Sequence, residues 1–342
     1  MRKLMIIIVG IIIPGVLIFA VYKGYNLLFE ANVNPNVAPY SLYISENTTI
    51  EEVYDQFLED QVLEAPDGFL LLASKKGLTH PKSGHYLIES GQSSNTIVNM
   101  LMAGFQSPVR IHFTGGESLR DLSQKLAKQL MVGEEELYIA LSVEREGWEG
   151  PAALGAYMPD TYEMYWNASA SSVAEKLYQN TVRFWSPERV EQAQALGLSP
   201  AGASTLASIV MKESSEAEDR PKVARLYLNR LDIGMKLQAD PTVIYALNRK
   251  NPEQKIQRVL TKDLSIQDPY NTYYVKGLPP GPICVAERAA LEAVLNAPKH
   301  EYIFMCADPD RFGFHAFAKS YNEHLRNQRK WTAYLNRRKI YR

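Results

Sequence analysis

The sequence has few cysteines, no excess of charge of either sign and no glycine-rich loop of the kind that cradles a phosphate. Lys and Arg number 37 and Asp and Glu 38, which leaves a formal net charge of -1. Proteins that bind nucleic acid carry a basic surface, so we expect no nucleic-acid partner. Neither cysteine, Cys284 or Cys306, has a histidine near it at the spacing of zinc ligands. We therefore expect no metal and no organic cofactor, and the sequence leaves open whether the two thiols pair.

Glycine and proline are also too scarce for a fibrous or low-complexity protein, with 20 and 19 residues. Hydrophobic residues make up 46% of the chain and charged residues 22%, which is typical of a folded protein. A chain of 342 residues exceeds one average domain. We expect two packed units, or one large unit with an appendage.

The longest apolar run lies at the start of the chain. Residues 4–22 read LMIIIVGIIIPGVLIFAVY, which is uncharged and long enough to cross a bilayer as a helix of about 20 residues. No small-x-small cleavage site follows this run, which favours a retained anchor over a cleaved signal peptide. Because Arg2 and Lys3 precede the run, the positive-inside rule places residues 1–3 in the cytoplasm. The prediction is a single-pass membrane protein whose remaining residues lie outside.

The next segments alternate between short strands and helices. Residues 23–38 are interrupted by Pro35 and several Asn residues and predict a tether. Within residues 39–130, a strand, a polar turn and an amphipathic helix follow one another three times, which predicts a small α+β module. Its first unit resembles a LysM-type peptidoglycan-binding module in this pattern, and a generic spacer domain is the alternative.

Residues 131–342 predict a mainly helical domain, so the fold class is α+β. Within it, residues 203–247 read as three helices, with Pro221 in the first turn of the second and Gly234 at its C-terminal cap. Residues 301–318 predict a short β-hairpin, and a last helix begins near Tyr321.

One acidic residue falls where the helical period places apolar side chains. Leu206, Val210 and Glu213 lie at positions i, i+4 and i+7 of the first of these helices. A carboxyl group in apolar surroundings keeps its proton to higher pH and can act as a general acid. The alternative is a Glu213 at the rim of the stripe that pairs in solvent with Lys212 or Arg220.

Three more acidic residues follow Glu213. Glu216, Glu218 and Asp219 lie in the polar turn before the next helix. Carboxyl groups in such turns are commonly solvated or cap the following helix. We expect those roles for them, and not catalysis.

The region around Glu213 resembles a known family. ASIVMKESSEAEDRPKVARLYLNRLDIGMKLQADPTVIYAL, followed by YNTY and GLPPGPI, is similar to the MltG (YceG-like) family of endolytic murein transglycosylases, over roughly residues 155–325. The resemblance implies that Glu213 is the catalytic acid, since it matches the second Glu of the family's Glu-Lys-Glu stretch. The first Glu of that stretch is Met211 here, which suggests that it is not needed for the chemistry.

The resemblance also implies a reaction. Such an enzyme cleaves the β-1,4 bond between N-acetylmuramic acid and N-acetylglucosamine without water and leaves a 1,6-anhydro end. A single carboxyl can serve, because the C6 hydroxyl of the sugar replaces the second carboxylate of ordinary glycosidases. The expected partners are peptidoglycan glycan strands, the lipid bilayer through residues 4–22, and peptidoglycan synthases at a bacterial cytoplasmic membrane, where cleavage would end strand elongation.

Further residues are candidates for binding the substrate. Gln238 and Asp240 could contact sugar hydroxyl or acetamido groups, although Asp240 fits equally an N-cap of the following helix. Asn271 and Tyr273 offer an amide and an aromatic face, with turn formation and packing as the alternative.

Two more candidates come from the resemblance. Asp160 and Tyr162 lie in a block similar to the family's Phe-Pro-Asp-Thr-Tyr motif, with Met158 in place of Phe. We expect them to line the cleft. His315, in the expected hairpin, is interpreted as structural and not catalytic.

Two other functions stay open at this point. A peptidoglycan hydrolase would need a second carboxylate, for which Asp240 and Asp160 are the candidates. A glycan-binding scaffold that recruits cell-wall synthases would need no catalytic residue, and Glu213 would then be an ordinary helix-end residue.

Overall fold

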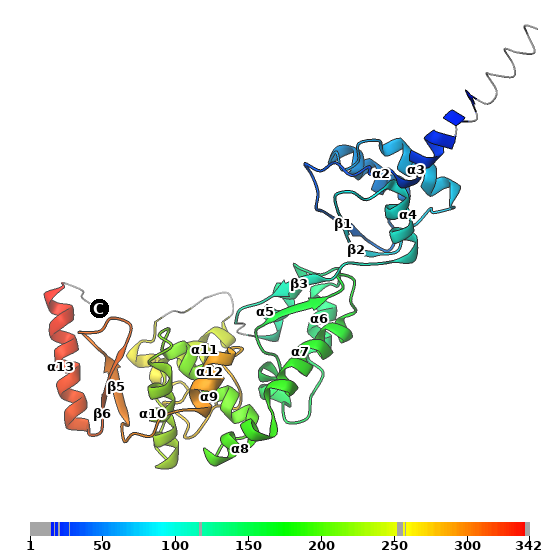
Figure 1. Ribbon diagram of the computed structural model, residues 1–342. Helices are drawn as coiled ribbons and strands as arrows, with labels where there is room; N and C mark the ends of the chain where they lie inside the picture. The colour runs from blue at the N-terminus through cyan, green and yellow to red at the C-terminus, as the bar shows by residue number, and fades with distance from the viewer. Residues whose placement is uncertain are drawn as a thin grey trace, which may run out of the picture. The chain divides into compact units, whose positions relative to one another are not determined.

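The structure is a computed structural model, and it describes residues 15–16, 18–19, 21–26, 28–115, 118–251, 256 and 258–338 (Figure 1). The chain forms many helices and three two-stranded sheets, which confirms the α+β class. By its internal contacts it divides into two compact units. Unit 1 holds the segment up to Ile111 and the short segments 129–132 and 163–168, and unit 2 holds the other residues from His112 onward.

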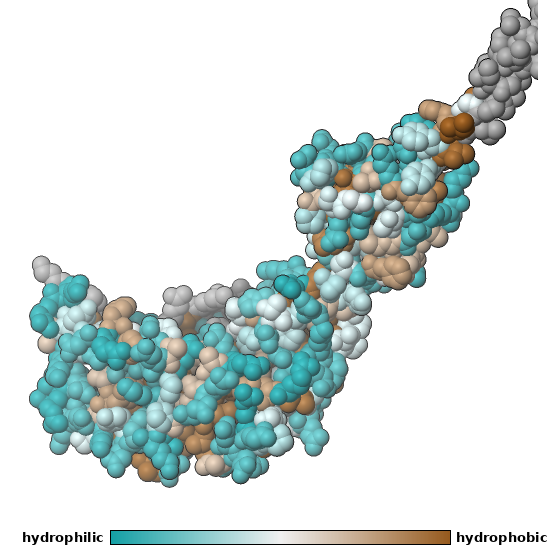
Figure 2. All heavy atoms as spheres, viewed as in Figure 1, coloured by the Kyte–Doolittle hydropathy of each residue, from teal (hydrophilic) through white to brown (hydrophobic). Residues whose placement is uncertain are grey.

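The predicted membrane span lies largely outside the described residues. Among the residues that the structure does describe, no helix combines the length and the apolar character needed to cross a bilayer. The described residues at the end of this run and just after it nevertheless expose large hydrophobic side chains, and brown atoms lie beside the grey ones in Figure 2. They are Val16, Ile18, Phe19, Val21, Tyr22, Tyr25 and Phe29. The membrane anchor stays a prediction.

Unit 1 contains the first two predicted strand-turn-helix units. Its elements are β1 (Tyr40–Ile44), α2 (Ile50–Glu59), α3 (Pro66–Lys75), β2 (Gly84–Ile88) and α4 (Ser94–Ala103). The Thr49 side chain accepts from the Glu52 backbone N–H and the Glu52 carboxylate accepts from the Thr49 backbone N–H, a capping box that fixes the start of α2. β1 and β2 pair antiparallel, and the helices cover a core that includes Phe57 and Phe69.

The third predicted unit is built differently. β3 (Val109–His112) pairs with β4 (Thr161–Met164), a strand that the sequence pattern did not reveal, and the division between the units falls within both strands. α5 (Leu119–Ala127) packs against α6 (Glu134–Leu141), and both helices lie in unit 2, although the segment 129–132 between them belongs to unit 1. The predicted start of the catalytic domain at residue 131 stays a prediction. The assignment of functions to these segments stays a prediction.

Unit 2 is mainly helical, as expected. Its further helices are η1 (Gly150–Ala156), α7 (Ala170–Phe184), α8 (Pro187–Ala195), α9 (Pro200–Glu213), α10 (Arg220–Asp232), α11 (Asp240–Lys250), η2 (Thr261–Ser265), α12 (Arg288–Leu295) and α13 (Tyr321–Arg337). Every residue of α9 from Ala203 to Val210 is buried, because α8, α10, α11, α12 and η1 all pack against this helix. A helix buried on all sides is the centre of the unit.

The predicted boundaries around α9 are confirmed. Pro221 lies in the first turn of α10, and Gly234 follows its end with a φ of 65°, a left-handed conformation that glycine adopts without strain. β5 (Phe304–Ala307) and β6 (His315–Ala318) form the predicted hairpin, and α13 begins at Tyr321.

The proline-rich loop at 277–282 is packed tightly onto unit 2. Its neighbour Ile283 donates its backbone N–H to the buried Ser208 Oγ on α9, at 3.0 Å. A Cβ atom at Gly281 would lie 2.0 Å from the Pro151 carbonyl oxygen in η1. Two backbone segments meet here, so only glycine fits.

We therefore expect Gly281→Ala to destabilise the protein by about 3 kcal/mol, the upper range for an overpacked site, since backbone atoms must move to relieve the clash. Thermal unfolding followed by circular dichroism measures this. Gly202→Ala in α9 is the matched control, because it lies inside a helix and a Cβ there makes only ordinary contacts, the nearest 3.4 Å from Ser199 Oγ. Equal melting temperatures for the two variants would contradict the packing described.

Candidate active site

Glu213 is the last residue of α9, and its side chain is partly buried. Leu206 and Val210 on the same stripe are fully buried, as the period predicted. Arg220, one of the two solvent partners considered, donates to the Ser214 carbonyl oxygen at 2.9 Å and pairs with another carboxylate. Glu213 thus sits where the core of unit 2 reaches the surface.

Burial raises the pKa of Glu213 to about 7, and the charge of Asp240 acts in the same direction. The position at the carboxyl end of a helix also disfavours a negative charge. A hydrogen bond from the Tyr227 hydroxyl to Glu213 Oε1, 3.0 Å long, and the charges of His315 and Arg230 lower this pKa. The balance leaves a carboxyl group that can both give and take a proton near neutral pH.

Tyr227 and Arg230 on α10 are site residues that we did not predict. Tyr227 is 1% exposed, and burial raises its pKa well above the ordinary value, so the hydroxyl acts as a donor. Arg230 is buried and donates to the carbonyl oxygens of Leu237 and Ile303. Tyr227 and Arg230 lie at positions i+4 and i+7 after the buried Val223, so both fall on the apolar stripe of α10. Glu213 was identified by the same pattern, a polar group on an apolar stripe.

Asp240 and Tyr273 meet beside this group. The Tyr273 hydroxyl donates to Asp240 Oδ1 at 2.6 Å, and the charges of Glu213 and Arg230 both influence the pKa of Tyr273, which burial raises. The capping role that we left open for Asp240 is not observed, because the N-cap of α11 is Ala239 and Asp240 is the first helical residue.

Gln238 lies on the loop that leads to Asp240. It is exposed and has a φ of 51°, a left-handed conformation that costs energy in a residue with a Cβ. Its backbone N–H donates to the Thr272 carbonyl oxygen at 3.1 Å, and the buried hydroxyls of Thr242 and Thr272 lie 2.9 Å apart. Strain held by such a network is common at functional sites.

Asn271 takes the structural role of the two that the sequence left open. Its side chain is fully buried, donates to the carbonyl oxygens of Leu264 and Ile266 and accepts from the Tyr273 backbone N–H. Contact with a sugar would require these bonds to break. Asn271 instead shapes the turn that presents Tyr273.

Asp160 and Tyr162 lie together beside α7. Asn180 donates to Asp160 Oδ2 and to the Tyr162 hydroxyl, at 3.1 Å each. Tyr162 is 4% exposed and stacks on Phe113, whereas Asp160 is exposed. Of these two residues, only Asp160 is exposed, so the predicted cleft-lining role is open to Asp160. Tyr162 is buried, and Asn180 connects the two by hydrogen bonds.

The acidic turn after Glu213 differs from our expectation at one residue. Glu218 is exposed, but Asp219 is 2% exposed, occupies the N-cap position of α10 and makes no capping bond with its side chain. Its Oδ2 lies 2.6 Å from His315 Nδ1. His315 therefore has a buried carboxylate as partner.

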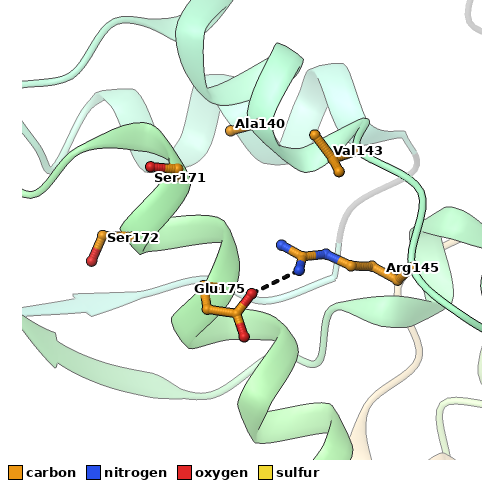
Figure 3. A pocket seen from close by; sticks show the side chains of 6 residues that line it. All are labelled: Ala140, Val143, Arg145, Ser171, Ser172 and Glu175. Atoms are coloured by element: carbon orange, nitrogen blue, oxygen red, sulfur yellow. Dashed lines mark hydrogen bonds and ion pairs between the residues drawn. The ribbon is translucent and has the colours of Figure 1, made fainter.

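A hollow of about 480 Å³ opens elsewhere in unit 2 (Figure 3). Arg145 and Glu175 point toward each other there and form an ion pair of 2.7 Å. Ala140, Val143, Ser171 and Ser172 complete its lining. None of the predicted site residues lines this hollow.

The cysteines and acidic groups show no metal centre. Cys284 and Cys306, both described, form no disulfide with each other, and burial raises the pKa of Cys306. Within the described part of the chain, no three His, Cys, Asp or Glu side chains are placed to hold a metal ion.

A family model describes most of this architecture. The YceG-like family matches residues 42–330. The chain belongs to the YceG-like family. The match includes Glu213 and all the candidate binding residues named above, so the resemblance seen in the motifs is confirmed.

Two relatives of this chain are named endolytic murein transglycosylases. An endolytic murein transglycosylase of Bacillus subtilis is 25% identical over 323 residues, which are 86% of this chain and 86% of that protein. One of Streptococcus pneumoniae is 23% identical over 90% of this chain, which spans only 61% of that longer protein. A crystal structure of a protein described as YceG-like from Listeria monocytogenes covers 84% of this chain and 98% of its own, at 24% identity and a TM-score of 0.56. That likeness shows the shared fold.

The raised pKa of Glu213 predicts a pH-dependent effect of Glu213→Gln on stability. A carboxyl group whose pKa rises from 4.5 to about 7 on folding stabilises the fold below pH 4.5, and that contribution is lost as the pH rises through 7. Gln keeps an acceptor for Tyr227 and carries no charge. The free energy of unfolding of the variant, relative to wild type, should therefore grow by about 3 kcal/mol between pH 4 and pH 8.

Urea unfolding at several pH values measures this difference. The control is Glu188→Gln on α8, which removes an exposed carboxyl group and should show no comparable gain. A difference for Glu213→Gln that does not change with pH would mean that the carboxyl group is ionised in the fold at neutral pH.

Proposed function

We propose that the protein is an endolytic lytic transglycosylase that cleaves peptidoglycan glycan strands, with Glu213 as its catalytic acid and base. One observation carries the proposal: a partly buried carboxyl group at the end of α9, whose pKa burial raises to about 7, in a stretch that resembles the family's Glu-Lys-Glu motif. The relatives named endolytic murein transglycosylases support the substrate class and the reaction.

The proposed reaction uses one carboxyl group twice. Protonated Glu213 donates to the glycosidic oxygen as the bond from C1 of N-acetylmuramic acid to that oxygen breaks. The resulting carboxylate takes the proton of the C6 hydroxyl, and O6 of the same sugar bonds to C1. The products are a free hydroxyl on N-acetylglucosamine and a 1,6-anhydro end, and no water is consumed.

Residues around Glu213 are suited to binding the saccharide and to stabilising the charge that develops on it. Asp240 carries negative charge near the carboxyl group, where it would stabilise the positive charge that develops on the sugar ring. The ring of Tyr273 and the strained, exposed Gln238 lie on the neighbouring loop and offer a flat apolar face and an amide to the saccharide. We assign these three residues to substrate binding.

Hydrolysis is the second candidate, and Asp240 is the observation that favours it. Its charge is felt at Glu213, as the second carboxylate of a glycosidase would be. A hydrolase would give reducing ends and not anhydro ends.

Location is part of the proposal. The apolar run at residues 4–22 and the exposed apolar side chains beside it support a single-pass anchor in a bacterial cytoplasmic membrane. The catalytic unit would then lie on the outer side, near the strands that peptidoglycan synthases produce. The LysM-like pattern in unit 1 supports a glycan-binding role there.

Mass spectrometry of uncrosslinked glycan strands incubated with the full-length protein in detergent tests the reaction. We expect 1,6-anhydro fragments of intermediate length from the wild type and a loss of at least about a thousandfold with Glu213→Gln, because no other group replaces the acid. Glu188→Gln, an exposed carboxyl group on α8, should cleave like wild type.

The product ends decide between the candidates. Reducing ends that disappear in Asp240→Asn would establish the hydrolase. Strands that stay intact but bind to wild type would support the glycan-binding scaffold and contradict catalysis.

Membrane association is tested by flotation of the full-length protein with phospholipid vesicles. We expect it to float and a chain lacking residues 1–22 to stay in the soluble fraction, because burying the apolar run stabilises insertion. Equal flotation of both chains would contradict the anchor.

A further inference from the structure

The hairpin of unit 2 is attached to the acidic turn that follows Glu213. Arg311, in the turn between β5 and β6, pairs with Glu218 at 3.5 Å. Gly313 lies so close to Glu216 that a Cβ atom there would be 3.1 Å from its Oε1. On α10, Arg230 Nε donates to the Ile303 carbonyl oxygen, just before β5, at 2.7 Å. The hairpin therefore contacts the acidic turn through its β5–β6 turn and contacts α10 through the residue before β5.

Asp219 is the buried residue of the acidic turn that contacts the hairpin. An Asp at the N-cap position ordinarily accepts from the first turn of its helix, but this carboxylate does not. It faces His315, which brings its Nδ1 to 2.6 Å of Oδ2 and its backbone N–H to 3.4 Å of Oδ1. With a protonated imidazole, the shorter contact is a charge-assisted hydrogen bond.

The imidazole held in this way acts on Glu213. Its charge favours the ionised form of the carboxyl group and lowers the pKa of Glu213. Besides Tyr227, which donates to Glu213, the groups whose charges act on the pKa of Glu213 come from three elements: Arg230 from α10, Asp240 from α11 and His315 from β6.

We propose that Asp219 and His315 form a positioning pair that holds a positively charged imidazole toward Glu213 and stabilises the carboxylate left when Glu213 gives up its proton. The pair extends the proposed function, on which its role in the reaction rests. Arg230 is buried and donates to two carbonyl oxygens, whereas His315 is paired with the carboxylate of Asp219.

The direct test is the titration of the Glu213 carboxyl group by carbon-13 NMR, in full-length protein labelled at the glutamate carboxyl carbons and assigned with Glu213→Gln. In His315→Gln the midpoint should move to higher pH, because a positive charge that favoured the carboxylate is gone. Asp219→Asn should move it in the same direction, and its equal volume preserves the fold if the histidine variant unfolds. His300→Gln, which removes a histidine bonded to the Lys222 carbonyl oxygen, is the control and should leave the midpoint unchanged.

Kinetics give the second readout. With glycan strands as substrate, His315→Gln should lower kcat/KM about tenfold at pH 6 and shift the alkaline decline of the pH profile upward, whereas a structural defect alone lowers the profile without shifting it. An unmoved Glu213 titration in both folded variants overturns the positioning pair whatever the activity. A moved titration in a protein that produces no anhydro ends supports the pair and refutes the proposed function instead.

Discussion

The burial of α9 is the constraint on which the rest of unit 2 depends. A helix covered on every side leaves its polar ends as the only places where it can present a functional group. Glu213 occupies the carboxyl end, where desolvation and the helix dipole both oppose ionisation. Because α10 packs against this core, its Tyr227 side chain reaches Glu213 from a rigid element.

Backbone hydrogen bonds from buried side chains connect the surrounding segments. Arg230 bridges the loop before α11 and the start of the hairpin, Thr242 and Thr272 join α11 to the loop that carries Tyr273, and Ser208 attaches the proline-rich segment to α9. Each uses a polar side chain to satisfy backbone groups that irregular segments would otherwise bury unpaired. These hydrogen bonds connect the irregular loops around Glu213 to the neighbouring helices.

Periodicity and capping signals predicted the helices around Glu213, the end of α10 at Gly234 and the hairpin, because these depend on residues close in sequence. They left open whether Glu213 is buried or pairs in solvent. β4 and its pairing with β3 escaped prediction, since a four-residue strand gives little pattern and its partner lies some fifty residues earlier. Asn271 illustrates a second limit of prediction from sequence. An asparagine in a turn has the same sequence pattern whether its amide binds a ligand or hydrogen-bonds to the backbone. Asp219 and His315 are 96 residues apart, and only the fold brings them together.

The surroundings of Glu213 shift its pKa in opposite directions. Burial and the charge of Asp240 raise the pKa of Glu213, while the hydrogen bond from Tyr227 and the charges of His315 and Arg230 lower it, and the balance lies at about 7. A residue that gives a proton in one step and takes one in the next works best when neither form is strongly preferred. The acidic turn is thus more than a connection between α9 and α10: by burying Asp219 against His315, it positions a cation that opposes the desolvation imposed by the core.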